Sequence, residues 1–133
     1  MPAPRNPRKK DFYVYRFKVA DYPFYVGVGR AERASDRLRY VKSLMVPKNR
    51  TRLASKSLSV RVMAALLKRG EHIRWTRTRF MTRSEALRLE KKTINRLVSA
   101  GFLLANWQHN PSRHNNTAKA VGAIISRRKI RKP

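Results

Sequence analysis

Residues 12–29 read FYVYRFKVADYPFYVGVG, and this stretch decides the fold. Its first half is aromatic and β-branched, which predicts a strand over 12–20. The residues at 21–23 predict a short turn, and a second strand follows over 24–28. The two strands therefore form a hairpin at the start of the domain.

The sequence after the hairpin predicts helices around one further strand. Thr82 and Glu85 have the spacing of a capping box, which marks a helix start. The fold class is therefore α/β in the α+β sense, a small three-stranded antiparallel sheet flanked by helices. The expected elements are a cationic helix (31–43), a loop (45–55), an amphipathic helix (57–69), a strand (72–81), a helix (82–100) and a short helix (117–128).

Composition divides the chain into three parts. Residues 1–11 are rich in proline and cations and predict a disordered arm. Residues 12–107 hold the predicted sheet and helices and form the domain. Residues 108–133 predict a polar linker, a short helix and a basic tail.

Charge is the strongest compositional signal. The 133 residues include 33 Lys and Arg but only 7 Asp and Glu, which gives a formal net charge of +26. Such a surface repels itself unless an anionic partner neutralises it, and a phosphate polymer is the natural partner. We expect this partner to be DNA, duplex or branched, with RNA as an alternative.

Several classes of protein are excluded. The sequence has no cysteine, so disulfides, thiolate zinc sites and cysteine nucleophiles are ruled out. It has no phosphate-binding loop of the Gly-x-x-x-x-Gly-Lys type. No apolar run is long enough to span a bilayer, and we expect no secretory signal. These features predict a cytoplasmic protein of a prokaryote or a virus that does not associate with membranes.

One acid stands out by its position in the 82–100 helix. On an ideal helix Glu90 lies in the middle of an apolar stripe. The stripe consists of Ala86, Leu87, Ile94, Leu97 and Val98. A carboxylate there is partly desolvated unless a cation meets it. Two interpretations stay open, an ion pair with one of the many arginines or a ligand of a metal ion.

The hairpin carries a pair of tyrosines. Tyr15 and Tyr25 are ten residues apart on adjacent strands, so we expect them to lie close together. A half-buried phenol seeks a hydrogen bond for its hydroxyl. Packing within the hairpin is the structural alternative to a functional role.

The 31–43 helix and the residue before it are rich in arginine. Arg33 and Arg37 are four residues apart and share one face of the helix. Arginine is suited to phosphate because its guanidinium donates two parallel hydrogen bonds. The alternative is a solvated basic helix. Further cations expected to contact nucleic acid are Arg30, Arg39, Lys119, Arg127, Arg128 and Lys129.

Four short motifs follow one another along the chain. Tyr13-Val14-Tyr15 on the first strand precedes Tyr25-Val26-Gly27-Val28-Gly29 on the second, and Arg33 comes six residues after Gly27. The segment 84–94 reads SEALRLEKKTI, which contains Glu90. Leu104-Ala105-Asn106 follows this helix.

In this order the motifs resemble those of the GIY-YIG nuclease family over residues 12–107. The second triplet, with Pro23 and Phe24 before it, is similar to a subgroup that reads Pro-Phe-Tyr-(Val/Ile)-Gly-Lys-Gly. Val28 stands in place of the frequent lysine. Arg37 stands where a histidine often follows the catalytic arginine by four residues, and a longer-loop register would make Arg37 the catalytic arginine.

The resemblance implies a metal-dependent endonuclease that hydrolyses phosphodiester bonds in DNA. One divalent cation, Mg²⁺ or Mn²⁺, would be held by Glu90 together with the scissile phosphate. Tyr15, directly or through Tyr25, would orient or deprotonate the attacking water, with nearby cations depressing the phenol pKa. Arg33 would neutralise charge on the phosphate in the transition state.

The resemblance also implies structural roles. Asn106 would brace the sheet or a backbone segment, and Gly27 and Gly29 would be required by the hairpin. The alternative function is a non-catalytic nucleic-acid-binding protein, architectural or ribosome-associated, that uses the same fold.

Overall fold

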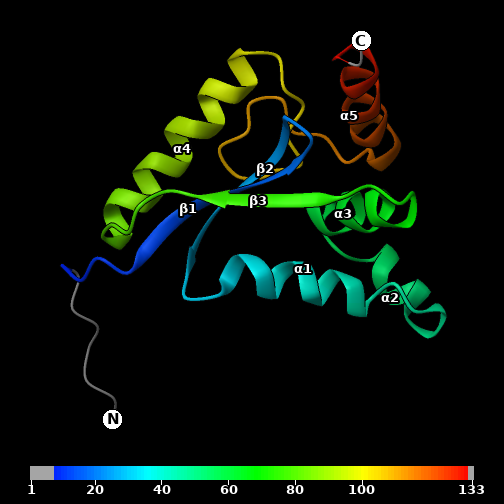
Figure 1. The fold of residues 1–133 in the computed structure, drawn as a ribbon, viewed down its shortest axis with the longest axis horizontal. Coiled ribbons are helices and arrows are strands. Elements are labelled where there is room, and N and C mark those ends of the chain that lie inside the picture. The colour runs from blue at the N-terminus through cyan, green and yellow to red at the C-terminus, as the bar shows by residue number, and fades with distance from the viewer. Residues whose placement is uncertain (1–7, 132–133) are drawn as a thin grey trace.

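The computed structural model describes the backbone of residues 8–131 and the side chains of residues 8–126. Residues 1–7 of the arm expected over 1–11, and the end of the tail at 132–133, lie outside the described residues. Three strands form one sheet, and helices pack against it (Figure 1). The elements in order are β1 (Phe12–Val19), β2 (Tyr22–Arg30), α1 (Arg33–Ser43), a 3₁₀-helix η1 (Pro47–Asn49), α2 (Arg50–Ala54), α3 (Leu58–Lys68), β3 (Ile73–Arg77), α4 (Arg83–Ser99) and α5 (Thr117–Arg131).

The sheet is antiparallel with the order β2-β1-β3, so β1 is the central strand. This confirms the predicted three-stranded α+β fold. The turn differs from the prediction, because Ala20 adopts a left-handed conformation (φ 51°) and β2 already begins at Tyr22. In the resulting register Tyr15 lies opposite Gly27, and Phe17 lies opposite Tyr25.

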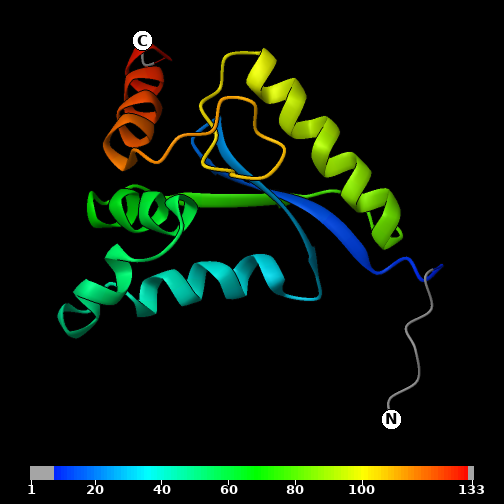
Figure 2. The same cartoon turned by 180° about the vertical axis from the view of Figure 1, so that it is seen from behind.

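Each face of the sheet has its own core, because alternate residues of β1 point to opposite faces. Tyr13, Tyr15 and Phe17 are buried against α1, α3 and α5. Val14 and Val26 point the other way and pack against α4. The two views in Figures 1 and 2 show α4 on one side of the sheet and α1 with α3 on the other.

The segment after α4 covers the open edge of β2. The Ala105 N–H donates to the Phe24 carbonyl at 2.7 Å. The Asn106 side chain accepts from the Val26 N–H at 3.0 Å and donates to the Val26 carbonyl at 2.7 Å. An edge strand otherwise leaves such groups unpaired. The bracing role expected of Asn106 is therefore confirmed.

The helix that carries Glu90 begins as predicted. The Thr82 hydroxyl accepts from the Glu85 N–H at 3.2 Å, and the Glu85 carboxylate accepts from the Thr82 N–H at 3.1 Å. This reciprocal pair is a capping box. After the helix, Gly101 adopts φ 93°, a conformation that favours glycine.

Two predictions from local sequence were wrong in part. The loop expected over 45–55 contains η1 and α2, because Pro47 already has the φ value of a first helical turn and Leu53 packs against the main core. The strand expected over 72–81 ends at Arg77, and Met81 forms only an isolated bridge with Phe12. In the described part of the chain, the helices are too short or too polar to cross a bilayer.

The C-terminal helix differs most from its expected role as an appendage. Ala120, Val121, Ile124 and Ile125 of α5 are buried in the main core, where α5 packs on α3. The helix expected over 117–128 is therefore present, and its apolar side faces the domain. The predicted domain boundary at residue 108 therefore separates α5 from a domain whose hydrophobic core it shares.

We predict that Ile124→Ala lowers the free energy of unfolding by about 2–5 kcal/mol, because Ile124 is fully buried and its truncation leaves a cavity. Lys119→Ala on the exposed side of α5 is the control and should change it by less than about 0.5 kcal/mol. Urea unfolding followed by circular dichroism measures both variants. An Ile124→Ala variant as stable as Lys119→Ala would contradict the packing of α5.

Candidate functional site

The two tyrosines predicted to form a pair lie on the same face of the hairpin. Their ring centroids are 6.3 Å apart, and Tyr15 is buried while Tyr25 is half-buried. The Tyr15 ring lies directly on the backbone of Gly27. A Cβ at Gly27 would approach Cζ and the hydroxyl of Tyr15 to 2.6 Å, so only glycine allows this contact.

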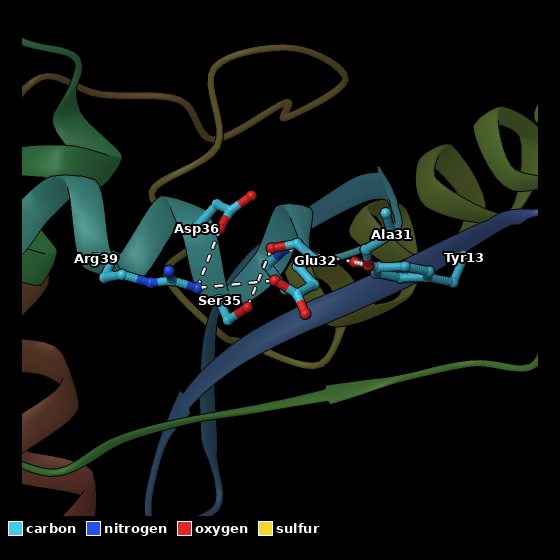
Figure 3. A network of polar contacts seen from close by, with 7 residues as sticks. Tyr13, Ala31, Glu32, Ser35, Asp36 and Arg39 are labelled. Atoms are coloured by element: carbon cyan, nitrogen blue, oxygen red, sulfur yellow. Dashed lines mark hydrogen bonds and ion pairs between the residues drawn. The ribbon is translucent and has the colours of Figure 1, made fainter.

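Tyr13 of the first triplet fixes the start of α1. Its hydroxyl donates to the Ala31 carbonyl at 2.7 Å and accepts from the Ala34 N–H at 3.4 Å (Figure 3). The N-cap residue of α1, Glu32, makes no side-chain cap. A Cβ at Gly29 would meet Arg33 Cβ at 2.9 Å, so this glycine lets α1 start close to β2.

The two arginines of α1 meet the two tyrosines. Arg33 lies close enough to the Tyr15 hydroxyl to lower the pKa of that phenol. The Arg37 guanidinium lies over the Tyr25 ring, 4.6 Å from its centroid, and donates to the Ser59 hydroxyl. Among the described residues, Nε of Arg37 is buried and has no hydrogen-bond partner. Arg37 also lines a cavity, so its guanidinium can meet an anion there.

A cavity of about 600 Å³ brings four of the predicted site residues together. Tyr25, Arg37, Glu90 and Asn106 line it, and each comes from a different part of the chain. Cavities of this size are typical of ligand-binding sites. Tyr15 and Arg33 are not in the cavity wall. Tyr15 lies next to it, because its ring is 6.3 Å from that of Tyr25, and Arg33 lies near the Tyr15 hydroxyl.

Glu90 lies on the buried side of α4, as the helical stripe predicted. Ala86, Ile94 and Leu97 of the stripe are buried, but Leu87 is 39% exposed, so that member was assigned wrongly. Leu87 lies at the margin of the packed face, and Thr93 is buried instead. Burial raises the pKa of Glu90, and the nearby charge of His109 opposes this shift.

The interpretation of Glu90 as the partner of an arginine is not what the described residues show. No ion pair or hydrogen bond of the Glu90 side chain is present among them. Its carboxylate is half-buried, lies in a polar cavity and resists ionisation. These properties fit a carboxylate that receives a cation from solution.

The environment of Tyr15 opposes the expected activation of its phenol. Burial raises the pKa of Tyr15, and the proximity of Tyr25 raises it further. Arg37 and Arg33 lower it, but their effect is smaller than that of burial. The expectation that nearby cations depress this pKa is therefore wrong for the free protein, and the phenol is neutral at pH 7.

The donor set fits one kind of metal site. In the part of the chain that the structure describes, no three His, Asp or Glu residues come together as a metal cage. Mg²⁺ does not need such a cage, because it keeps several waters and binds through one or two carboxylates plus substrate phosphates. Glu90, in a polar cavity that Arg37 also lines, meets that requirement.

The cations predicted to contact nucleic acid have different surroundings. Arg39 contacts Asp36 at 3.1 Å and Glu32 at 3.9 Å, as Figure 3 shows, and Arg30 lies 3.9 Å from Asp11. Lys119 is exposed on α5. The backbone of the remaining three belongs to α5, but their side chains lie outside the described part: Arg127, Arg128 and Lys129.

The cavity also contains residues that sequence reasoning missed. Ser57 and Ser59 at the start of α3 line it, and so do Trp107, Gln108 and Asn115. Arg61 connects these segments, since it donates to the Lys56 carbonyl, to Thr117 and to Asn115. Of these residues, only Trp107, next to Asn106, is of a type that the sequence alone would mark as a candidate binding residue.

Comparison of the chain with known protein families, with curated proteins and with solved structures finds no match.

Two glutamates of α4 are predicted to affect stability with opposite sign. The pKa of Glu90 is raised by burial, so its stabilising contribution is present below the ordinary value of 4.5 and is lost as the pH rises through the raised pKa. Glu90→Gln should therefore be more stable than the unmodified protein at pH 8, with a smaller difference at pH 4.

Glu85 is the matched control on the same helix. Hydrogen bonds with Thr82 lower its pKa, so its contribution is present at neutral pH and is lost as the pH falls. Glu85→Gln should be less stable than the unmodified protein at pH 8. Urea unfolding at both pH values tests the pair, and a destabilised Glu90→Gln at pH 8 would show that the carboxylate has a structural partner.

Proposed function

We propose that the protein is a metal-dependent endonuclease that hydrolyses phosphodiester bonds in DNA. The observation that carries the proposal is the shared cavity, in which Glu90, Arg37 and Tyr25 meet from three elements. The Glu90 carboxylate has a raised pKa and forms no ion pair or hydrogen bond among the described residues. Such a group is costly to retain for packing alone. The net charge of +26 supports a phosphate polymer as substrate.

The side chains support a division of roles. Glu90 would hold the divalent ion, Mg²⁺ or Mn²⁺, which when bound stabilises the negative charge on the leaving oxygen. Tyr25 lines the cavity and would orient the attacking water, and the neutral, buried Tyr15 would act on that water through Tyr25. A neutral phenol both donates and accepts a hydrogen bond, which suits this task.

The arginines complete the site in different ways. Arg33 lies near the Tyr15 hydroxyl, beside the hairpin, where it would meet charge that develops on the phosphate. Arg37 lines the cavity, so its guanidinium would bind the phosphate already in the ground state. This assignment keeps Arg33 as the catalytic arginine.

Glu90→Gln is predicted to reduce plasmid nicking in Mg²⁺ by orders of magnitude while DNA affinity is unchanged or slightly higher. The amide does not hold the ion, and the loss of one negative charge does not weaken phosphate binding. Glu85→Gln, on the exposed side of the same helix, should nick at the normal rate, and EDTA should stop both active proteins.

The alternatives give different outcomes in the same assay. Normal nicking by Glu90→Gln would contradict the single-ion proposal. A protein that binds DNA tightly but does not nick it with Mg²⁺ or Mn²⁺ would favour the non-catalytic nucleic-acid-binding alternative.

The arginine assignment predicts a kinetic difference. Arg33→Ala should lower the single-turnover rate at saturating protein by orders of magnitude, because Arg33 acts on the transition state. Arg37→Ala should mainly weaken DNA binding. Lys42→Ala removes an exposed cation from the last turn of α1 and controls for the loss of charge. If Arg37→Ala abolishes turnover and Arg33→Ala does not, the two roles are exchanged.

A further inference from the structure

A tryptophan at the wall of the cavity has no evident role in packing. Trp107 is 58% exposed, the most exposed large apolar side chain among the residues whose side chains are described. It lies in the segment between α4 and α5, coloured yellow to orange in Figure 1, and it lines the same cavity as Glu90 and Arg37. Leaving an indole in water costs free energy that packing does not recover here.

The position of Trp107 is nevertheless fixed from both sides. On one side Asn106 is bonded to both polar groups of Val26 in β2. On the other side Asn110, only 4% exposed, donates to the Asn106 carbonyl at 2.8 Å and to the Leu104 carbonyl at 3.3 Å. Trp107 is thus an exposed side chain on a braced backbone, which is the arrangement of a preorganised contact.

A cation already covers part of the indole. The Arg113 guanidinium lies 5.0 Å from the centroid of the Trp107 ring. The turn that holds Arg113 is also braced, because the Arg113 N–H donates to the Asn110 carbonyl at 3.2 Å and the Ser112 N–H to the Asn110 side chain at 3.0 Å. A guanidinium next to an indole combines a phosphate-binding cation with a surface for stacking.

The cavity beside the indole is polar. Hydroxyl groups of Ser57 and Ser59 and amide groups of Gln108 and Asn115 line it. These groups can donate and accept hydrogen bonds at the edge of a base, whereas Arg37 supplies a charge for phosphate. A base has to leave the helical stack before its flat face can lie on an aromatic side chain.

We propose that Trp107, with Arg113, forms a stacking subsite for an unpaired base of a DNA strand next to the cleavage site. The inference rests on the proposed function, because it takes the cavity to be the place where the strand is bound. It assigns the substrate as DNA with at least one unpaired nucleotide, such as a fork or a bulge, in preference to continuous duplex.

Binding in EDTA tests the subsite without any cleavage. The experiment uses the full chain with the substitution Trp75→Phe, which leaves Trp107 as the only tryptophan. This variant is titrated with a forked DNA and with a continuous duplex of equal length. Fluorescence anisotropy of labelled DNA gives the affinities. Tryptophan fluorescence should be quenched by the forked DNA and much less by the duplex.

Trp107→Ala should weaken binding of the forked DNA by about 5- to 150-fold, as the loss of one stacked base does, and should leave duplex affinity unchanged. Trp107→Phe should recover most of the loss, because it keeps a stacking surface. Trp75→Ala is the matched control, since Trp75 is also exposed and lies on a basic strand, and it should have no selective effect.

Equal losses for both DNAs, or no loss for either, would overturn the proposal. A selective loss in Trp75→Ala in place of Trp107→Ala would overturn it as well. The assay separates this proposal from the proposed function. If no variant nicks DNA but the selective effect of Trp107 is observed, the stacking subsite stands and the nuclease does not.

Discussion

The contact between the Tyr15 ring and the backbone of Gly27 is the constraint on which the site depends. A single added carbon at Gly27 would come within 2.6 Å of the Tyr15 hydroxyl, so the Tyr15 ring can keep this position across from Gly27 only with glycine there. This contact sets the position of Tyr15 beside Tyr25 and presents its hydroxyl to Arg33. Tyr13, two residues earlier on the same face, anchors the first turn of α1 and thereby aims the arginines at the tyrosines.

Electrostatics give the site its character. In a chain with 33 cations, a carboxylate without an ion pair among the described residues is unexpected, because so many partners are available. Glu90 is held away from them by its place on the packed side of α4, where burial makes ionisation costly. A bound cation would remove that cost. Burial also keeps the Tyr15 phenol neutral. The site therefore contains a neutral hydrogen-bonding group, Tyr15, and a separate group that can carry charge, Glu90.

Local pattern predicted much of this arrangement. Alternation of aromatic and β-branched residues identified the hairpin, the Thr82–Glu85 spacing identified the start of α4, and the helical period placed Glu90 on the packed side. What the pattern missed depends on contacts between distant segments. Trp107 and Ser59 share a cavity only because the α4–α5 segment is bonded to β2 and Arg61 connects α3 to the residues before α5. The shift of the Tyr15 pKa depends on burial by helices far along the chain, and the packing of α5 on α3 could not be read from its own residues.

We propose that the cavity holds one divalent ion between Glu90 and a DNA phosphate. Anomalous scattering from Mn²⁺ in crystals of the Arg33→Ala variant bound to DNA tests it directly, because that variant keeps Glu90 and should leave the strand intact. If Glu90 holds the ion, we expect one strong Mn²⁺ peak in the cavity, coordinated by the Glu90 carboxylate and by a phosphate oxygen. A complex in which DNA occupies the cavity and Mn²⁺ binds elsewhere, or in which the DNA lies on another face, would contradict it.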